Sequence, residues 1–459
     1  MRTLPYTDTM AVSEPNVVLI HCHDLGRYIG CYDADIETPN LEALAESGVL
    51  FENHFGTAPQ CSPSRGSLMT GRFPHVNGLM GLAHGQWSLH EGERILPQYL
   101  QEAGYETHLF GLQHIAQDTD RLEYDHIHSE GNLYPGVSPA VHQTNRAKTV
   151  ASVLCSCLED DDYESPFFAS VGFFEIHRAE EEGGRYGFEG DEYEAEDPHD
   201  VRPLSYLPDR WGIRHDIAEM HGMVYAIDEA VGQIVETIEE TGLEEETIVI
   251  FTTEHGIAFP RAKGSCYDPG IEAALLIRYP GLPNSGETYD QLVSNVDVLP
   301  TILDIIGIDP PEELNGRSFY SLLSDEDQYE ERDRVFAEMT WHDMYNPVRT
   351  IRTERYKYIR NFWHLPKVYL SADVFASEAG REVREKYSVP TRPYEELYDL
   401  QEAPQEDENV VFEPRYQETR IELARELHQW MEATEDPLLD GPLVPADYES
   451  IQQWPHEQG

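Results

Sequence analysis

Basic residues are scarce in this sequence, and so are features that would direct the chain to nucleic acid or to a membrane. There are 32 lysines and arginines against 86 aspartates and glutamates, which gives a formal net charge of −54. Phosphate binding needs a basic surface, so this balance argues against a nucleic-acid partner. No stretch approaches the roughly eighteen apolar residues of a membrane helix, so we expect no membrane partner either.

Paired cysteines are also missing. The six cysteines form no Cys-x-x-Cys pair and no framework typical of a secreted disulfide protein. The first residues lack a charged and then apolar leader with a small-residue cleavage site. We therefore expect a cytoplasmic protein in a reducing compartment, with an unrecognised export route as the alternative. Most cysteines are expected to be buried as small apolar side chains.

The acidic residues are spread along the whole chain and are not gathered in one tail. Such a charge destabilises a compact state by self-repulsion, and dissolved salt screens that repulsion. A salt-rich host therefore explains the composition better than an acidic function does.

Dialysis out of molar salt is expected to unfold the protein, because the repulsion among its carboxylates is then no longer screened. The thermal midpoint, followed by circular dichroism, should fall steeply as potassium or sodium chloride is withdrawn. A midpoint independent of salt would count against an adaptation to a high-salt host.

Length and periodicity predict an α/β protein. A chain of 459 residues suits one large domain with a smaller appendage. Short β-branched or aromatic runs alternate with helical patterns, which indicates a large, mostly parallel sheet sandwiched by helices. The expected strands are Asn16–Cys22, Thr107–Leu112, Pro166–Phe174, Thr247–Thr253 and Ala273–Arg278. The expected helices are Pro39–Ser47, Leu96–Ala103, Ser138–Leu158, His215–Thr241 and Leu299–Ile306.

The pattern changes near Asp333. Segments typical of antiparallel strands follow, and then a long helical stretch, Glu413–Thr434. We predict a catalytic domain over residues 1–332 and a smaller C-terminal α+β subdomain over residues 333–459.

Polar residues follow several of the expected strands. They are His23 with Asp24, His114, His177, and Glu254 with His255. In open α/β sheets ligands bind beyond the carboxyl ends of the strands, so these side chains are predicted to converge on one cleft.

The sharpest motif lies in the segment APQCSPSRGSLMTGRFPHVNG. Cys61, Pro63 and Arg65 form Cys-x-Pro-x-Arg, and Met-Thr-Gly-Arg follows at 69–72. Here the chain resembles the sulfatases of the alkaline-phosphatase-like superfamily. The resemblance covers nearly the whole chain, because TPNLEALAESGVLFENHF, VSNVDVLPTILDIIGI and ELYDL are similar to landmarks of that family.

The resemblance implies that Cys61 is oxidised to formylglycine by a formylglycine-generating enzyme of the host. One hydroxyl of the aldehyde hydrate attacks sulfur and expels the alcohol or amine. The second hydroxyl then loses its proton, reforms the aldehyde and releases sulfate. A serine would be left holding a stable sulfate ester.

The resemblance also implies a divalent metal against the nucleophile, held by residue pairs that follow two strands. Here those pairs are His23–Asp24 and Glu254–His255. The two acidic residues offer hard oxygens suited to calcium, the expected metal, or to magnesium. The histidines depart from the family pattern, and imidazole favours transition metals over calcium, so manganese also stays open. His255 is expected to be a ligand, whereas His23 is either a ligand or a neighbour that does not touch the metal.

Three further residues match polar helpers of the family. His114, in GLQHIAQ, matches the histidine that takes the proton of the nucleophile's hydroxyl, although Leu112 stands where the family has a lysine. His177 matches the general acid that protonates the leaving group. Lys263 matches a cation that clamps the sulfate against its developing charge.

Within the family the chain is similar to the sulfamidase (heparan N-sulfatase) group, in PHVNGLMGL, FPRAKGSCYDPG and HQWMEATEDPLLDGPLVP. This likeness implies a sulfate ester or N-sulfate (sulfamate), on a sugar. Glu175 would then orient His177 or contact the substrate. His342 and Arg349 would meet the sugar or its anionic group, or else form ordinary subdomain surface. The exact substrate and the oligomeric state stay open.

Two alternatives remain at this point. A phosphate or phosphonate ester hydrolase of the same superfamily would suit histidine ligands, but such enzymes usually carry threonine or serine as nucleophile. A catalytically degenerate sulfatase kept as a binding protein would account for Leu112 and the altered metal pair. The Cys-x-Pro-x-Arg motif argues against a phosphate or phosphonate ester hydrolase. The same motif, together with both catalytic histidines and Lys263, argues against a degenerate sulfatase.

Overall fold

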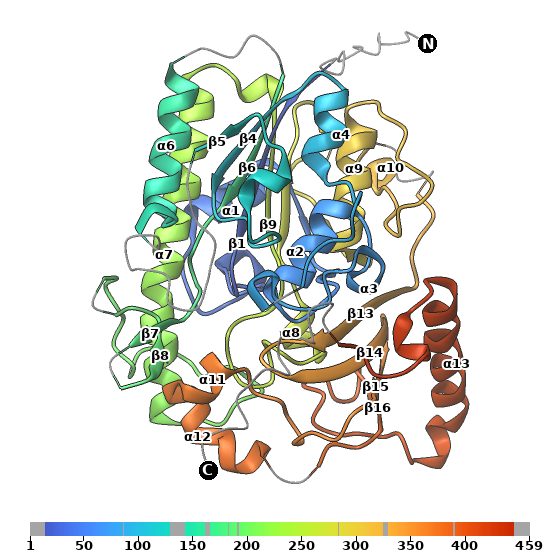
Figure 1. The fold of residues 1–459 in the computed structure, drawn as a ribbon. Helices are drawn as coiled ribbons and strands as arrows, with labels where there is room; N and C mark the ends of the chain where they lie inside the picture. The colour runs from blue at the N-terminus through green and yellow to red at the C-terminus, as the bar shows by residue number, and fades with distance from the viewer. Residues whose placement is uncertain are drawn as a thin grey trace, which may run out of the picture.

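An eight-stranded sheet runs through the centre of the molecule (Figure 1). The computed structural model describes residues 14–85, 87–128, 143–160, 166–181, 183–190, 192–282, 284–324, 329–388 and 391–444. The strands lie in the order β11 (Thr288–Tyr289), β2 (Val49–Phe51), β10 (Leu275–Arg278), β9 (Thr247–Thr253), β1 (Asn16–Cys22), β6 (Phe167–Gly172), β4 (Glu106–Gly111) and β5 (His126–Ile127).

The pairing in this sheet is mostly parallel. Strand β1 lies between β9 and β6 and is parallel to both, and β4 and β5 continue the parallel part. Strand β10 departs from this pattern, because it pairs antiparallel with β9 and with β2. The predicted mostly parallel sheet is therefore confirmed, with β10 as an antiparallel insertion.

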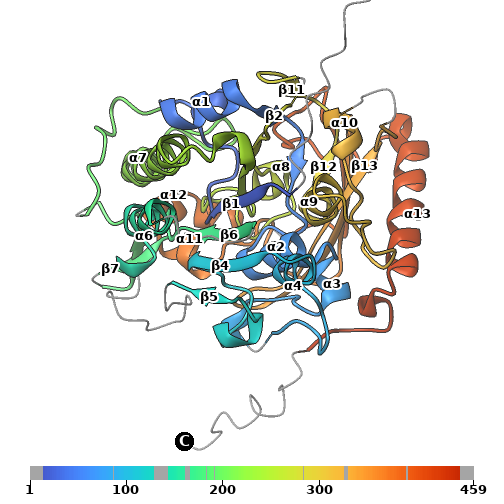
Figure 2. The same ribbon diagram turned by 90° about the horizontal axis from the view of Figure 1, so that it is seen from above.

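Helices cover both faces of the sheet, which explains why its strands are apolar throughout. Along β1, Val18 and Ile20 pack into the core beneath α6 and α7, whereas Val17 and Leu19 pack into the core beneath α4 and α9 (Figure 2). The helices of this part are α1 (Pro39–Ser47), α2 (Cys61–Thr70), α3 (Pro74–Asn77), α4 (Leu96–Glu102), α6 (Ala147–Glu159), α7 (Trp211–Glu240), α8 (Asp268–Ile271), α9 (Val298–Ile305) and α10 (Tyr320–Ser324). None of the helices within the described ranges is long and apolar enough to cross a membrane.

One predicted helix is wrong in its extent. The sequence predicts a single helix over Ser138–Leu158, but α6 begins at Ala147, and Arg146 before it has an extended backbone (φ −67°, ψ 141°). The expected cap at Ser138 and Pro139 lies outside the described residues. The other predicted helices and strands of this part are present, with ends that differ by four residues at most.

A four-stranded antiparallel sheet forms the centre of the C-terminal part. Its strands are β13 (Arg334–Trp341), β14 (Tyr345–Thr353), β15 (Tyr356–Asn361) and β16 (Glu395–Asp399), in that order. The helix predicted over Glu413–Thr434 is α13 (Gln417–Ala433), which follows a 3-10 turn. The described residues also form two small ribbons, β3 (His54–Phe55) with β12 (Val293–Ser294) and β7 (Ala179–Glu181) with β8 (Arg185–Gly187).

The two parts make direct contact. Helices α11 (Ala372–Ala376) and α12 (Glu378–Tyr387) of the C-terminal part lie near α7 (Figure 1). The backbone N–H of Ala379 donates to Asp216 Oδ2 of α7 (3.1 Å), and Gly212 N–H donates to Glu382 Oε1 (3.3 Å). The division into residues 1–332 and 333–459 stays a prediction, and these contacts show that the C-terminal part is anchored on the first.

Candidate active site

The carboxyl ends of β1 and β9 bring four polar side chains together. The two strands are parallel with Cys22 beside Thr253, so the residues that follow them also lie side by side. His23 Nδ1 lies 2.8 Å from Glu254 Oε1, and His255 Nε2 lies 3.1 Å from Asp24 Oδ1. These four side chains are almost completely buried. The predicted convergence at this edge of the sheet is confirmed for them.

Helix α2 places Cys61 and Arg65 against this group. Cys61 is the first residue of the helix, and its Sγ lies 3.7 Å from Asp24 Oδ1. One turn later, the Arg65 guanidinium contacts the Glu254 carboxylate, and its Nη1 lies 2.6 Å from Nδ1 of His21. Burial raises the pKa of the Cys61 thiol to about 12.

Lys263 bridges the cluster to the C-terminal part. Its Nζ lies 2.7 Å from Asp24 Oδ2 and 2.9 Å from Asp373 Oδ2, and Asp373 belongs to α11. Burial alone would raise the pKa of Asp24, but Lys263 and His255 hold it well below its usual range. Asp373 was missed by sequence reasoning, since no motif marks it and only folding brings it to Lys263.

Two histidine rings flank His23. Its ring centroid lies 5.5 Å from that of His114 and 5.4 Å from that of His177. His114 Nε2 is 3.2 Å from Nδ1 of His84, a second site residue that the sequence did not single out. His177 Nδ1 donates to the Arg178 carbonyl (2.7 Å), which leaves Nε2 available for proton transfer. Burial lowers the pKa of both flanking histidines, so both rings are neutral near pH 7.

The backbone at the site is locally unusual. Asp24 (φ 50°) and His114 (φ 56°) both have left-handed backbone conformations, which are uncommon for residues other than glycine. Each follows the end of a sheet strand, where this conformation turns the chain sharply away from the strand. Functional sites are where such conformations concentrate.

The position at which the family has a lysine supplies no cation in this chain. The Leu112 side chain is fully buried and packs in the hydrophobic core, and its carbonyl lies 3.5 Å from Arg65 Nη1.

Two residues predicted to contact substrate are used elsewhere. Glu175 is fully buried, and its carboxylate accepts hydrogen bonds from the Ala147 N–H (2.9 Å) at the start of α6 and from Tyr193 (2.6 Å). This cap explains why α6 begins at Ala147. Arg349 is also fully buried and forms an ion pair with Asp436 (2.6 Å). Neither side chain reaches the surface, and each is held by partners inside the protein, which argues against the predicted substrate contacts.

His342 differs from these two. It is partly exposed and lies 2.6 Å from Asp343, and its charge also acts on Asp373 beside Lys263. Its position near the cluster keeps it a candidate substrate contact.

The cluster has the donors for a cation. His23, Asp24, Cys61 and Glu254 each offer one ligand atom, all within 4.8 Å of one another. His255 Nδ1 donates to the Gly256 carbonyl (2.8 Å), so its Nε2 faces the two carboxylates of Asp24 and Glu254. Although burial opposes it, the nearby carboxylates raise the pKa of His255 well above its usual range, so the ring itself carries a positive charge here. A divalent cation can take over this charge when His255 gives up its Nε2 proton, so the residues fit a metal ion.

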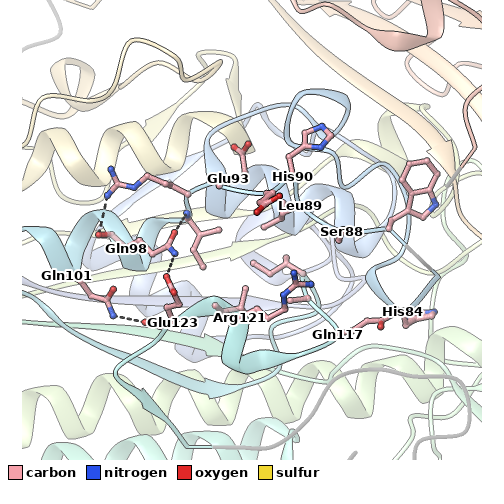
Figure 3. Close-up of a pocket in the computed structure, with 18 of the residues that line it drawn as sticks. His84, Ser88, Leu89, His90, Glu93, Gln98, Gln101, Gln117, Arg121 and Glu123 are labelled. Carbon is pink, nitrogen blue, oxygen red and sulfur yellow. Dashed lines mark hydrogen bonds between the residues drawn. The ribbon is translucent and has the colours of Figure 1, made fainter. Parts of the chain in front are cut away.

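A polar cavity of about 1520 Å³ adjoins the site at His84. In Figure 3, His84 and Gln117 lie at one end of this cavity, and Gln98, Gln101 and Glu123 lie at the other. Gln98 Nε2 donates to Glu123 Oε2 (2.7 Å), and Gln101 Nε2 donates to the Glu123 carbonyl (2.7 Å). Amides and carboxylates of this kind suit a ligand rich in hydroxyl groups.

Comparisons with known proteins agree with this geometry. Residues 15–308 match the profile of the family described as Sulfatase, and residues 254–391 match the profile described as N-sulphoglucosamine sulphohydrolase, C-terminal. The chain is 28% identical to N-sulphoglucosamine sulphohydrolase of Homo sapiens, covering 93% of this chain and 92% of that protein. It is 27% identical to an ulvan-active sulfatase of Formosa agariphila, covering 94% and 77% respectively. A crystal structure of a putative sulfatase from Bacteroides thetaiotaomicron has a similar fold, with a TM-score of 0.70 at 22% identity over 93% of this chain and 94% of that one.

Proposed function

Because the chain belongs to the sulfatase family and is a hydrolase of sulfuric esters, we propose that it cleaves a sulfate ester or an N-sulfate on a saccharide, with formylglycine made from Cys61 as the nucleophile. Its sheet, flanked by helices on both faces, is the alkaline-phosphatase-like fold of that family. One observation carries the proposal. Cys61 begins a buried helix and faces Asp24 at 3.7 Å, beside Lys263 and Arg65.

In this structure Cys61 Sγ stands in for a hydroxyl of the formylglycine hydrate. That hydrate supplies one hydroxyl to attack sulfur and a second whose deprotonation releases sulfate. The divalent metal, when bound, lowers the pKa of the attacking hydroxyl and neutralises sulfate oxygens.

Asp24, Glu254 and His255 are the proposed metal ligands, with His23 beside them. The two carboxylates suit calcium or magnesium, whereas His255 Nε2 suits a transition metal such as manganese. We therefore propose a divalent cation. The assay described below identifies it by comparing the turnover that each added metal restores.

The chain's own side chains then have separate tasks. Lys263 is held by Asp24 and Asp373 with its ammonium in the cluster, where it opposes the negative charge of the sulfate. His114 takes the proton of the nucleophile, with His84 holding its ring. His177 has its Nδ1 fixed on the Arg178 carbonyl, so it gives a proton to the leaving oxygen or nitrogen from Nε2 in its doubly protonated form, which the negative charge of a bound sulfate favours.

A saccharide is the proposed substrate class. The relatives named above act on N-sulphoglucosamine and on ulvan by their names, and the cavity at His84 offers amides and carboxylates to hydroxyl groups. The match of residues 254–391 to the sulphohydrolase profile favours an N-sulfated amino sugar over a simple aryl sulfate.

Protein purified from its own host in molar salt is expected to release sulfate from N-sulfated glucosamine or from an aryl sulfate. The peptide that contains Cys61 should be about 18 Da lighter than with cysteine, which is the change for conversion to formylglycine. The assay is repeated with calcium, magnesium and manganese after chelation, and an aryl phosphate is the third substrate. Phosphate release from unmodified Cys61 would move the protein to the phosphoesterases and overturn the proposal.

A further inference from the structure

Away from the catalytic cluster, one edge of the main sheet gathers a second set of metal-ligating side chains. Strand β5 is the last strand and is parallel to β4, with His108 beside His126 in the register. The His128 N–H donates to the Leu109 carbonyl (2.9 Å), so the pairing continues past β5. Residues two apart on a strand share a face. Glu106 and His108 of β4 therefore lie on one face with His126 and His128.

The donor atoms of three of these residues converge. His126 Nε2 lies 2.6 Å from Glu106 Oε1, and His108 Nε2 lies 3.7 Å from Glu106 Oε2. The rings of His108 and His126 are stacked, with centroids 4.7 Å apart. One ligand atom from each of the three residues lies within 4.8 Å of the other two. Two imidazole nitrogens and one carboxylate oxygen are thus close enough together to hold one ion.

A fourth histidine has the position of a supporting group. His128 Nε2 lies 3.1 Å from His108 Nδ1, on the side of the ring opposite Glu106, and the Cys157 thiol of α6 lies 3.9 Å from His128 Nδ1. Histidines that bind metals commonly hydrogen-bond through their second nitrogen, which fixes the orientation of the ring. His128 is therefore a positioning residue for His108.

Exposure suits a ligand set with one open position. The His108 side chain is 7% exposed, Glu106 31% and His126 47%, so solvent reaches the group from one side.

We propose that Glu106, His108 and His126 bind a zinc-type cation at the β4–β5 edge, with water as the fourth ligand. Two nitrogens and one carboxylate oxygen around an open fourth position are a set that zinc accepts, whereas calcium and magnesium prefer oxygen. The ion would replace the direct contact between His126 and Glu106. It would also tie β5, a strand of only two residues, to the rest of the sheet.

This site is separate from the catalytic one. Through the register, His108 lies beside Ala169 and Ala169 beside Val18, which is five residues before His23. Five residues of strand span roughly 17 Å, and β4 is two strands away from β1. One ion could not serve both places, so this proposal stands independently of the proposed activity.

Zinc binding by the full chain tests the proposal. Protein treated with a chelator is titrated with zinc in molar potassium chloride by calorimetry, and bound metal is counted by mass spectrometry. The wild type is expected to bind one zinc more than His126→Ala, and Glu106→Gln should weaken that zinc at least about tenfold. Zinc should raise the thermal midpoint of the wild type more than that of either variant.

His428→Ala is the matched control. His428 on α13 forms an exposed pair with Glu432 (3.5 Å), and among the residues that the structure describes no third metal ligand joins this pair. It should bind as many zinc ions as the wild type. Equal zinc counts in the wild type and His126→Ala would overturn the site, as would an equal loss in the control. If His126→Ala does not fold, an unchanged zinc affinity in Glu106→Gln would overturn it instead. The experiment measures metal content and not turnover. A failure of the zinc-site proposal can therefore be distinguished from a failure of the sulfatase proposal.

Discussion

Cys61→Ala is expected to lower sulfate release by a factor of at least about 10⁴, because the residue that becomes the nucleophile is removed. The Cys61 thiol lies 3.7 Å from Asp24 in the site and contributes little to the packing of the hydrophobic core. The thermal midpoint of the variant should therefore change only slightly. Turnover is measured on the substrate that the wild type hydrolyses, in the same salt and with the same metal. Normal turnover in Cys61→Ala would rule out the covalent mechanism.

Two companion variants sharpen that result. Cys155→Ala removes another buried thiol, on α6 and outside the site, and should leave turnover unchanged. Cys61→Ser keeps a hydroxyl without a hydrate, so it should retain sulfate on the serine, visible as a heavier protein by mass spectrometry. Loss of turnover in Cys155→Ala as well would mean that general damage, and not the nucleophile, explains the loss in Cys61→Ala.

Arg349→Met is expected to destabilise the protein by about 3–5 kcal/mol, because it leaves buried carboxylates without their partner. The fully buried guanidinium lies 2.6 Å from Asp436 Oδ2 and 3.0 Å from Glu338 Oε2, and Nη1 donates to the Met339 carbonyl (3.0 Å). Unfolding by guanidinium chloride, which keeps the ionic strength high, measures the change. The KM of folded enzyme should stay close to that of the wild type.

Arg360→Met is the control from the neighbouring strand. Arg360 lies directly opposite Arg349 in the register of β14 and β15, but its side chain is 29% exposed and its ion pair with Glu395 is longer, at 3.4 Å. Exposed pairs contribute little, so this change should cost about 1 kcal/mol or less. A stable Arg349→Met variant with a strongly raised KM would restore Arg349 as a substrate contact.

Much of the main sheet was predictable because its signals are local. The predicted ends of the strands Asn16–Cys22 and Thr247–Thr253 agree with the structure, since each strand contains an unbroken run of four apolar residues with polar residues on both sides. The wrong extent of α6 has a non-local cause. Its first N–H is capped by Glu175, a residue of another segment that periodicity cannot place.

The site divides in the same way. His23, Asp24, Glu254 and His255 could be grouped from sequence because each pair follows a strand and parallel neighbours end together. The contact of Asp373 with Lys263 and that of His84 with His114 could not be predicted from sequence. The two residues of each contact come from segments with no shared motif. The histidines of the β4–β5 edge were likewise missed, since they converge only once the two strands pair in their register.

Which residues could do chemistry and which strands would be buried can be read from the sequence, because motif spacing and apolar periodicity are properties of neighbours along the chain. The order of the strands, the antiparallel direction of β10 and the pairing of the buried charges depend on long-range contacts and follow from the folded structure. Arg349 illustrates the difference, because its type suits an anionic substrate equally well as a buried ion pair. The two carboxylates that enclose it, from β13 and from the chain beyond α13, favour the buried ion pair, and folding alone brings them together.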